Sequence, residues 1–296
     1  MTGILLLDKP QGMTSFVAAA RVKRFTKSKK TGHTGTLDPM ATGVLPVMLS
    51  GATRFCELLP SHDKAYRASL RLGVITDTLD TTGEILETHE VNATNEDFEK
   101  CLKTFEGTTL QMPPMYSAIS QNGVRLYKLA RQGIEVERPK REVTIHSKTV
   151  SMNEESHEYI IDVECSSGTY IRSLISDIGE KLGCGAVMTD LRRTKANGFS
   201  IDRCITLDEL QKICEEGRLE EFVIPVEEAL SSYREVEVTA AQANRFRNGG
   251  ALDIQRLKFP LKEENEFIRV FSPEREFLGI GEKLENELKV KRLLIK

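Results

Sequence analysis

The 296-residue sequence predicts an α+β protein with a small, separate β-rich unit at its C-terminal end. Short apolar runs typical of buried strands alternate with segments whose apolar residues recur at helical spacing. From about residue 233 the pattern changes to short strands. A hydrophobic fraction of 40% supplies a sizeable core. Length and pattern therefore predict two unequal domains, residues 1–232 and 233–296.

The N-terminal part begins with a buried strand and a helix. Residues 3–7 form an apolar run that ends at a turn rich in Pro and Gly, which predicts a short strand. Thr14 or Ser15 then caps a helical pattern. The end of this helix and the next loop, residues 21–30, hold six basic residues and no acidic one. Such a run is either a solvated helix end or a surface that contacts phosphate groups.

A second strand and helix form a corner later in the chain. Residues 159–165 alternate between apolar and polar types, which is the period of a strand. Residues 171–182 carry their apolar side chains on one helix face, with Thr169 as the expected N-cap. Tyr170 and Arg172 then fall in the first helical turn, where side chains can project beside a cleft.

Two further segments differ from this strand and helix pattern. Residues 111–142 read as a long loop before a short helix, and residues 125–141 within it hold six basic residues against two glutamates. Long loops with basic and aromatic residues often carry function. Residues 233–296 contain one helical pattern, 240–248, among short strands, which is enough for a small barrel.

Cysteine spacing, charge and the lengths of apolar runs indicate the cellular compartment of the protein and whether it binds a metal. The six cysteines are widely separated, so no zinc or redox spacing occurs, and we expect reduced, buried thiols and no structural metal. The longest charge-free stretch, residues 107–124, contains two prolines and cannot span a membrane. The N-terminus lacks a secretory signal pattern. We therefore expect a cytoplasmic protein with no membrane contact.

The densest group of functional residue types lies between residues 31 and 46. Three glycines, four threonines and one histidine surround the carboxylate of Asp38. On local chemistry alone, Asp38 and Pro39 can be an N-cap followed by proline at the first helical position. The glycines can also form a phosphate-holding turn, although their spacing matches neither the Walker nor the dinucleotide fingerprint.

This stretch resembles the signature of the bacterial tRNA pseudouridine-55 synthase (TruB) family, in which the aspartate of Gly-x-Leu-Asp-Pro is catalytic. The C-terminal section resembles the small PUA-type RNA-binding barrel of that family. Four further segments match in the family's order: residues 5–12, 71–80, 168–172 and 183–193. The resemblance covers essentially the whole chain.

The resemblance implies both a fold and an activity. The fold is the pseudouridine synthase fold, with a mixed, mostly antiparallel sheet and a central cleft, followed by a PUA-like domain. The activity is isomerisation of uridine to pseudouridine at position 55 in the T loop of tRNA, with the target base flipped out. The partner is the tRNA T stem-loop, without metal, cofactor or obligate protein partner, and the family suggests a monomer.

A single carboxylate suits this reaction, because the base leaves C1′ through N1 and rejoins it through C5. Asp38 can attack C1′ or C6 as a nucleophile, or remove a proton from C2′. The residues do not choose among these routes, and the resemblance favours the glycal route through C2′. A glycoside hydrolase would instead need two carboxylates at a defined separation.

The resemblance also assigns roles to the remaining site residues. It places Arg172 beside Asp38 as its counter-charge and gives Tyr66 to stacking on the extruded base and to proton transfer. His33 fills the gap left by the flipped nucleotide. Three more substrate-binding residues complete the set: Lys9, Tyr170 and Leu191. From the residues alone, the tyrosines can equally be core and Leu191 is core rather than pocket lining. His33 is packed and hydrogen-bonded rather than a general base.

The net charge of −3 has to be reconciled with a tRNA partner. The basic runs 21–30, 125–141 and 192–195 can converge on one face, and affinity then falls with salt. The family's Lys after Tyr-Ser-Ala-Leu is Ser120 here, so one RNA contact of the loop is missing. Two rival activities remain, an RNA chaperone without catalysis and a uridine glycosidase.

Overall fold

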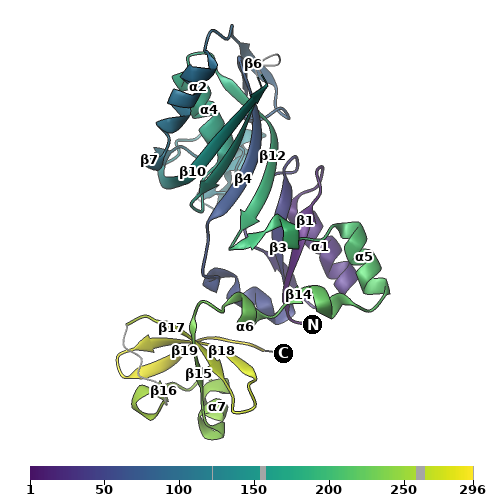
Figure 1. Ribbon diagram of the computed structural model, residues 1–296, viewed down its shortest axis with the longest axis vertical. Helices are drawn as coiled ribbons and strands as arrows, with labels where there is room; N and C mark the ends of the chain where they lie inside the picture. Colours follow the sequence, from purple (N-terminus) through teal and green to yellow (C-terminus); the bar gives the residue numbers. More distant parts are fainter. Residues whose placement is uncertain (122, 154–157, 258–263, 296) are drawn as a thin grey trace.

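The computed structural model describes residues 1–121, 123–153, 158–257 and 264–295. The chain forms an α+β fold with a ten-stranded sheet and a separate five-stranded sheet. The five-stranded sheet lies at one end of an elongated molecule (Figure 1). Two two-stranded hairpins complete the β structure of the described residues.

The large sheet is mixed and mostly antiparallel, as expected from the resemblance. Its main path runs, in order, through β14 (Val223–Ile224), β1 (Gly3–Lys9), β3 (Thr42–Leu49), β12 (Ala186–Ala196), β4 (Lys64–Leu72), β11 (Glu158–Cys165), β10 (Arg141–Asn153) and β7 (Gly107–Gln111). Two short strands pair beside it, β2 (Thr31–His33) on β3 and β13 (Phe199–Ser200) on β12. Along the main path, only the β3–β12 pair is parallel.

Strand β12 joins the two parts of this sheet. Along most of its length it pairs with β4, and at two positions, Arg192 and Arg193, it pairs with the start of β3. Gly43 makes the second approach possible: its φ is +101°, and a Cβ there would lie 2.2 Å from the Arg193 carbonyl oxygen. The close approach brings the segment before β3 to the side of β12.

Helix α1 (Ser15–Thr26) begins as the sequence predicts. Thr14 is its N-cap, and the Thr14 hydroxyl accepts a hydrogen bond from the Val17 amide. The helix buries Ala18, Ala19 and Val22 against the sheet on the side of β1 and β3.

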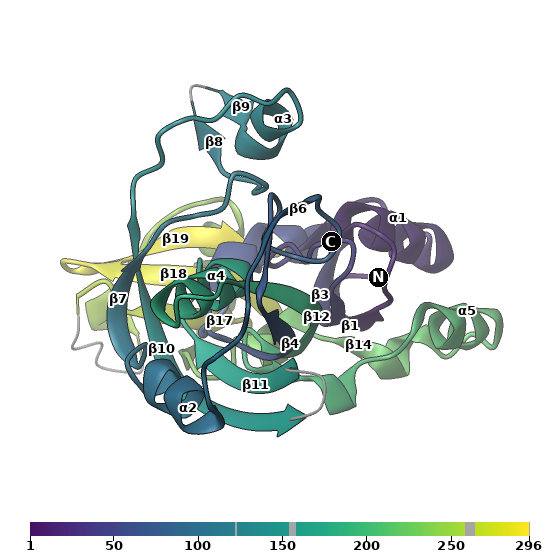
Figure 2. The ribbon, with the colours of Figure 1, turned by 90° about the horizontal axis from the view of Figure 1, so that it is seen from above.

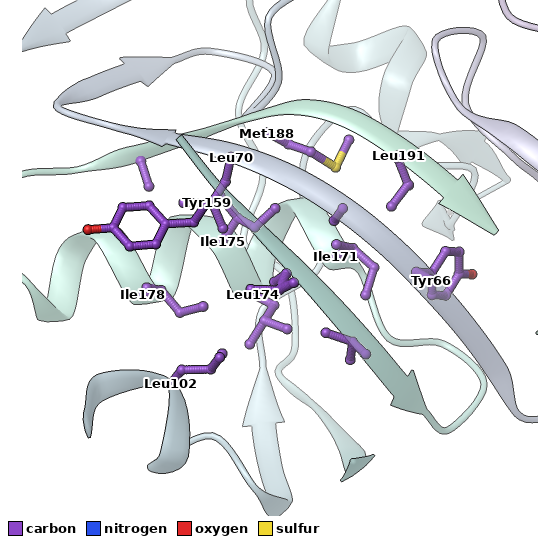
Figure 3. Close-up of a cluster of buried hydrophobic side chains, with 14 of the residues drawn as sticks. Tyr66, Leu70, Leu102, Tyr159, Ile171, Leu174, Ile175, Ile178, Met188 and Leu191 are labelled. Carbon is purple, nitrogen blue, oxygen red and sulfur yellow. The ribbon is translucent and has the colours of Figure 1, made fainter. Parts of the chain in front are cut away.

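Helix α4 (Ile171–Lys181) covers the other part of the sheet, over β12 and β4 (Figure 3). The expected N-cap at Thr169 is wrong. Tyr170 occupies the cap position without a side-chain cap, while the Thr169 hydroxyl donates to the Ser166 carbonyl in the preceding turn. The shift leaves Arg172 in the first turn of the helix, where its side chain is 5% exposed.

The chain between residues 207 and 229 is only partly helical. The chain there forms α5 (Leu207–Glu215), a 3₁₀ turn (Leu219–Phe222), β14 and α6 (Val226–Ala229). β14 pairs with β1 at the edge of the large sheet, and this strand separates α5 from α6. Two more 3₁₀ turns precede β4 and α5, at Ser50–Leu58 and Ile201–Arg203.

Residues 73–142 carry the insertions on the large sheet. They include the hairpin of β5 (Val74–Thr76) and β6 (Ile85–Thr88), helix α2 (Asn95–Lys103), the short strands β8 (Ser120–Gln121) and β9 (Val124–Arg125), and helix α3 (Leu126–Ala130). Figure 2 shows β8, β9 and α3 standing out from the body of the molecule on two long connections. The loop that the sequence singles out is thus an extended arm.

The five-stranded sheet has the order β15 (Arg234–Glu237), β17 (Phe267–Phe271), β18 (Phe277–Leu284), β19 (Glu287–Leu293) and β16 (Leu252–Asp253). Helix α7 (Ala240–Arg247) packs against it, and a 3₁₀ turn (Ile254–Arg256) follows β16. None of the helices in the described ranges is both long and apolar enough to cross a membrane.

Candidate active site

Asp38 lies in the loop between β2 and β3, and the loop is fixed from both sides. Buried Ser15 at the start of α1 holds the Leu37 peptide twice: its hydroxyl accepts from the Leu37 amide at 2.8 Å and donates to the Leu37 carbonyl at 3.1 Å. The Gly12 amide donates to the Pro39 carbonyl at 2.8 Å. No helix follows Asp38, because β3 begins at Thr42. The N-cap interpretation of Asp38 is therefore wrong.

The partner of Asp38 is Arg172. Nη2 of Arg172 lies 2.9 Å from Oδ2 of Asp38, and the Asp38 side chain is 36% exposed. The same guanidinium donates from Nη1 to the Thr78 carbonyl at 3.0 Å and from Nη2 to the Tyr116 carbonyl at 2.8 Å. One side chain of α4 thus connects the Asp38 loop, the β5–β6 hairpin and the base of the arm.

Burial is the main influence on the protonation of Asp38. It raises the pKa of Asp38 above the ordinary range, and the nearby Asp80 adds to the rise. The charges of Arg172 and Lys9 act in the opposite direction. A carboxylate with a raised pKa binds a proton more readily than an ordinary aspartate, which suits a group that acts as a base.

Asp80 is a second carboxylate that the sequence interpretation gives no role. Its Oδ2 lies 3.6 Å from Nη1 of Arg172, and its side chain is 5% exposed. The Thr78 hydroxyl and the Thr82 amide each donate to its Oδ1 at 2.9 Å. Asp80 lies in segment 71–80, which resembles the family, and this match is the sequence feature that could have pointed to it. Asp80 thus pairs with Nη1 of Arg172, whereas Asp38 pairs with Nη2.

Tyr66 and Leu191 lie on the neighbouring strands β4 and β12 and belong to one buried cluster (Figure 3). Burial raises the pKa of the Tyr66 hydroxyl. Tyr170 precedes Arg172, and the Gln111 side chain fixes its backbone: Oε1 accepts from the Tyr170 amide at 2.8 Å, and Nε2 donates to its carbonyl at 3.0 Å. The charge of Asp38 adds slightly to the rise in the pKa of both tyrosine hydroxyls, so both lie within electrostatic range of the carboxylate.

Lys9 and His33 border the same loop. Lys9 is 0% exposed, and its Nζ donates to the Pro10 and Met13 carbonyls at 2.9 and 2.8 Å. Burial lowers the pKa of Lys9 to about 8, with Asp38 opposing the shift. Burial also lowers the pKa of His33, so its imidazole is neutral at pH 7. A neutral imidazole suits packing against a base rather than binding a phosphate.

The basic run 192–195 does not form an open cationic surface. Arg192 pairs with Asp8 at 2.6 Å and Lys195 pairs with Glu164 at 2.9 Å. Arg193 is 0% exposed and donates to two backbone carbonyls, from Nε to Val44 at 2.7 Å and from Nη2 to Gly35 at 3.1 Å. The sequence interpretation missed this inward position, because an arginine in a basic run reads as surface.

The fold and the site define a class. A mixed sheet carries one loop carboxylate paired with a buried guanidinium, and two tyrosines lie on β4 and at the start of α4. A family model of pseudouridylate synthases matches residues 23–171 and places the protein in the class of pseudouridine synthases, and comparison with solved structures agrees in fold. The structure of a Cbf5-Nop10-Gar1 complex contains a chain that is 26% identical, with a TM-score of 0.74, covering 99% of this chain and 85% of that one.

The chain belongs to the TruB family. Residues 23–171 match the N-terminal domain of TruB family pseudouridylate synthases, residues 172–231 the C-terminal domain of tRNA pseudouridylate synthase B, and residues 235–294 the C-terminal region of pseudouridine synthase II TruB. A protein of Clostridium tetani named tRNA pseudouridine synthase B is 43% identical over the full length of both chains. A Bacillus pumilus protein of the same name is 41% identical over 95% of this chain and 92% of its own.

Proposed function

We propose that this protein isomerises uridine to pseudouridine at position 55 in the T loop of tRNA, with Asp38 as the catalytic carboxylate. The observation that carries the proposal is the 2.9 Å pair between Asp38 and Arg172 in a loop fixed by Ser15. Full-length relatives named tRNA pseudouridine synthase B support tRNA as the substrate.

The chemistry needs an oriented carboxylate with one oxygen available. Arg172 holds Oδ2 of Asp38, and Oδ1 has no hydrogen-bond partner among the described residues. That oxygen is the one to attack C1′ or C6, or to take the C2′ proton in the glycal route that we favour from the family resemblance. The Arg172 guanidinium stabilises the carboxylate before the reaction and each time it is regenerated.

The remaining residues bind the flipped nucleotide. Tyr66 stacks on the uracil and takes part in its proton transfer, while Tyr170 and Leu191 bound the base pocket. His33 fills the space that the base leaves in the loop of the tRNA. Lys9 supports the loop of Asp38 and contributes positive charge near the nucleotide.

The outlying parts bind the body of the tRNA. We assign residues 1–232 to the catalytic domain, with the arm of about residues 111–142 contacting RNA, and residues 233–296 to a PUA-like RNA-binding domain. The protein acts as a monomer in the cytoplasm, without a cofactor. The basic residues of the arm and the separate C-terminal sheet support this division of labour.

Replacement of Asp38 by Asn tests the proposal. The variant should release no tritium from 5-tritiated uridine in tRNA, because an amide neither attacks nor accepts the proton. It should still fold: burial raises the pKa of Asp38, so ionised Asp38 destabilises the folded state at pH 7 and a neutral amide removes that cost. Asp162→Asn is a matched control, since Asp162 lies in an exposed pair with Arg67.

Normal turnover by the Asp38→Asn variant would contradict the assignment. A nucleoside digest of the treated tRNA separates the rival activities in one chromatogram. Pseudouridine supports the proposed isomerase, unchanged uridine supports an RNA chaperone, and free uracil supports a glycosidase.

A further inference from the structure

Arg193 is a buried cation without a carboxylate partner. It is 0% exposed, and its guanidinium is held by the Val44 and Gly35 carbonyls. Its third nitrogen, Nη1, is buried with no hydrogen-bond partner among the described residues. Neither an aspartate nor a glutamate is among the groups whose charge acts on Arg193; those groups are Tyr66 and Cys204. A buried, unpaired charge is costly, so its presence beside the active site needs a functional reason.

The phenol of Tyr66 is the first of the groups whose charge acts on Arg193. Arg193 and Tyr66 are directly opposite each other in the antiparallel β12–β4 pair, so their side chains leave the same face of the sheet. The positive charge of the guanidinium lowers the pKa of the Tyr66 hydroxyl, against the larger effect of burial, which raises it. The charge of Asp38 acts in the opposite direction.

The isomerisation itself requires a proton carrier. Uridine has a hydrogen on C5 and none on N1, and pseudouridine has the reverse, so one proton leaves C5 and one arrives at N1. A phenolate oxygen can take the C5 proton, become a phenol, and return a proton to N1 directly or through water. The carrier ends in its starting state, and neither an oxidant nor an external acid is consumed.

We propose that Arg193 is a positioning residue for this step: its guanidinium, fixed by two backbone carbonyls, stabilises the Tyr66 phenolate that carries the proton from C5 to N1. The inference rests on the proposed function. The two buried arginines then have different roles: Arg172 pairs with Asp38, and Arg193 stabilises the Tyr66 phenolate. Holding Arg193 by main-chain oxygens leaves its positive charge unneutralised, which a carboxylate partner would not.

Single-turnover rates on tRNA with 5-protio or 5-deuterio uridine test the role. Arg193→Met removes the charge, and we expect a rate loss of about 100-fold, within the range for proton-transfer groups. A C5 deuterium isotope effect should appear, because proton removal becomes rate-limiting. Arg193→Lys keeps the charge and should retain more activity than Arg193→Met. Arg67→Met is the control, since Arg67 is next to Tyr66 on β4 but exposed on the opposite face.

A rate loss without a C5 isotope effect would overturn the role and leave Arg193 a structural residue. If the Arg193 variants do not fold, the wild-type chain with 3-fluorotyrosine at position 66 is used instead. This more acidic phenol should move the pH–rate profile to lower pH, and an unmoved profile overturns the inference. Failure of the proposed function looks different, since the wild-type protein would then form no pseudouridine at all.

Discussion

Two fully buried cations, Lys9 and Arg193, flank the loop that carries Asp38. Neither is within ion-pair distance of a carboxylate in the described part of the chain, and burial lowers the pKa of both. Such groups lower the stability of the folded state at neutral pH. The site therefore keeps positive charge in place for an anionic substrate at a cost in folding stability.

Lys9→Met tests the energetic effect of one of these cations. The pKa of Lys9 is about 8 in the folded protein and 10.5 ordinarily, so the unfolded chain binds more protons between these values and wild-type stability rises with pH. Methionine does not titrate. Chemical denaturation gives the free energy of unfolding of variant and wild type at both pH 7 and pH 10. From pH 7 to pH 10, the value for the variant should fall relative to that for the wild type by up to about 3 kcal/mol.

Lys29→Met provides the control for that measurement, because Lys29 is exposed and should give a difference that does not change with pH. A difference for Lys9→Met that is likewise constant between the two pH values would mean that Lys9 titrates like a surface lysine.

The sequence pointed to Asp38 and Arg172 through a matched motif, but not to the residues that orient them. On local chemistry alone, Asp38 could begin a helix, and only the start of β3 at Thr42 excludes this. Asp80 and Arg193 come close to the site through tertiary contacts with no counterpart in local spacing. A polar or basic residue in such a position reads as surface until the fold is known.

Secondary structure is likewise only partly predictable from the sequence, and strand β12 is an example. The strand at β11 and the helices α1 and α4 follow from periodicity, because each buries one face. β12 instead mixes buried apolar residues with buried Arg193 and exposed Asp190, so the alternation that marks a strand is broken. Its position between β3 and β4 shows why: it lies between two partners and carries active-site residues.

Gly43→Ala tests how tightly β3 and β12 depend on each other. The new Cβ would meet the Arg193 carbonyl oxygen at 2.2 Å with φ at +101°, so either the strand pair separates or the backbone moves. We expect a loss of more than about 3 kcal/mol in the free energy of unfolding by denaturant titration. Gly12→Ala has φ of +82° but nothing within 4 Å and should cost about 1 kcal/mol. Equal losses would show that only backbone strain matters at Gly43.

The surface charge of the molecule has to attract tRNA despite a net charge of −3. Because run 192–195 is paired or buried, the end of α1 and the arm remain as the basic segments. Lys29 and Lys30 follow α1 and are exposed. If they contact phosphates, replacing both by glutamate should weaken tRNA binding and make the slope of log K against log salt shallower by about 1.5 to 2.

The matched control for this pair is Lys100→Glu with Lys103→Glu on α2, within the acidic section 77–106. These exposed lysines should leave the salt dependence of tRNA binding unchanged. Equal salt slopes for the Lys29 and Lys30 double variant and the wild type would mean that the basic end of α1 is merely solvated.

The arm is fastened to the site through main-chain atoms. Arg172 donates to the Tyr116 carbonyl, and the Ser173 hydroxyl donates to the Met112 carbonyl at 2.9 Å. A carbonyl is present whatever side chain the residue carries. The side chains of the outer arm can therefore change to suit a different RNA surface without breaking these two hydrogen bonds. A chimera that carries the outer arm of a distant relative should still convert uridine to pseudouridine.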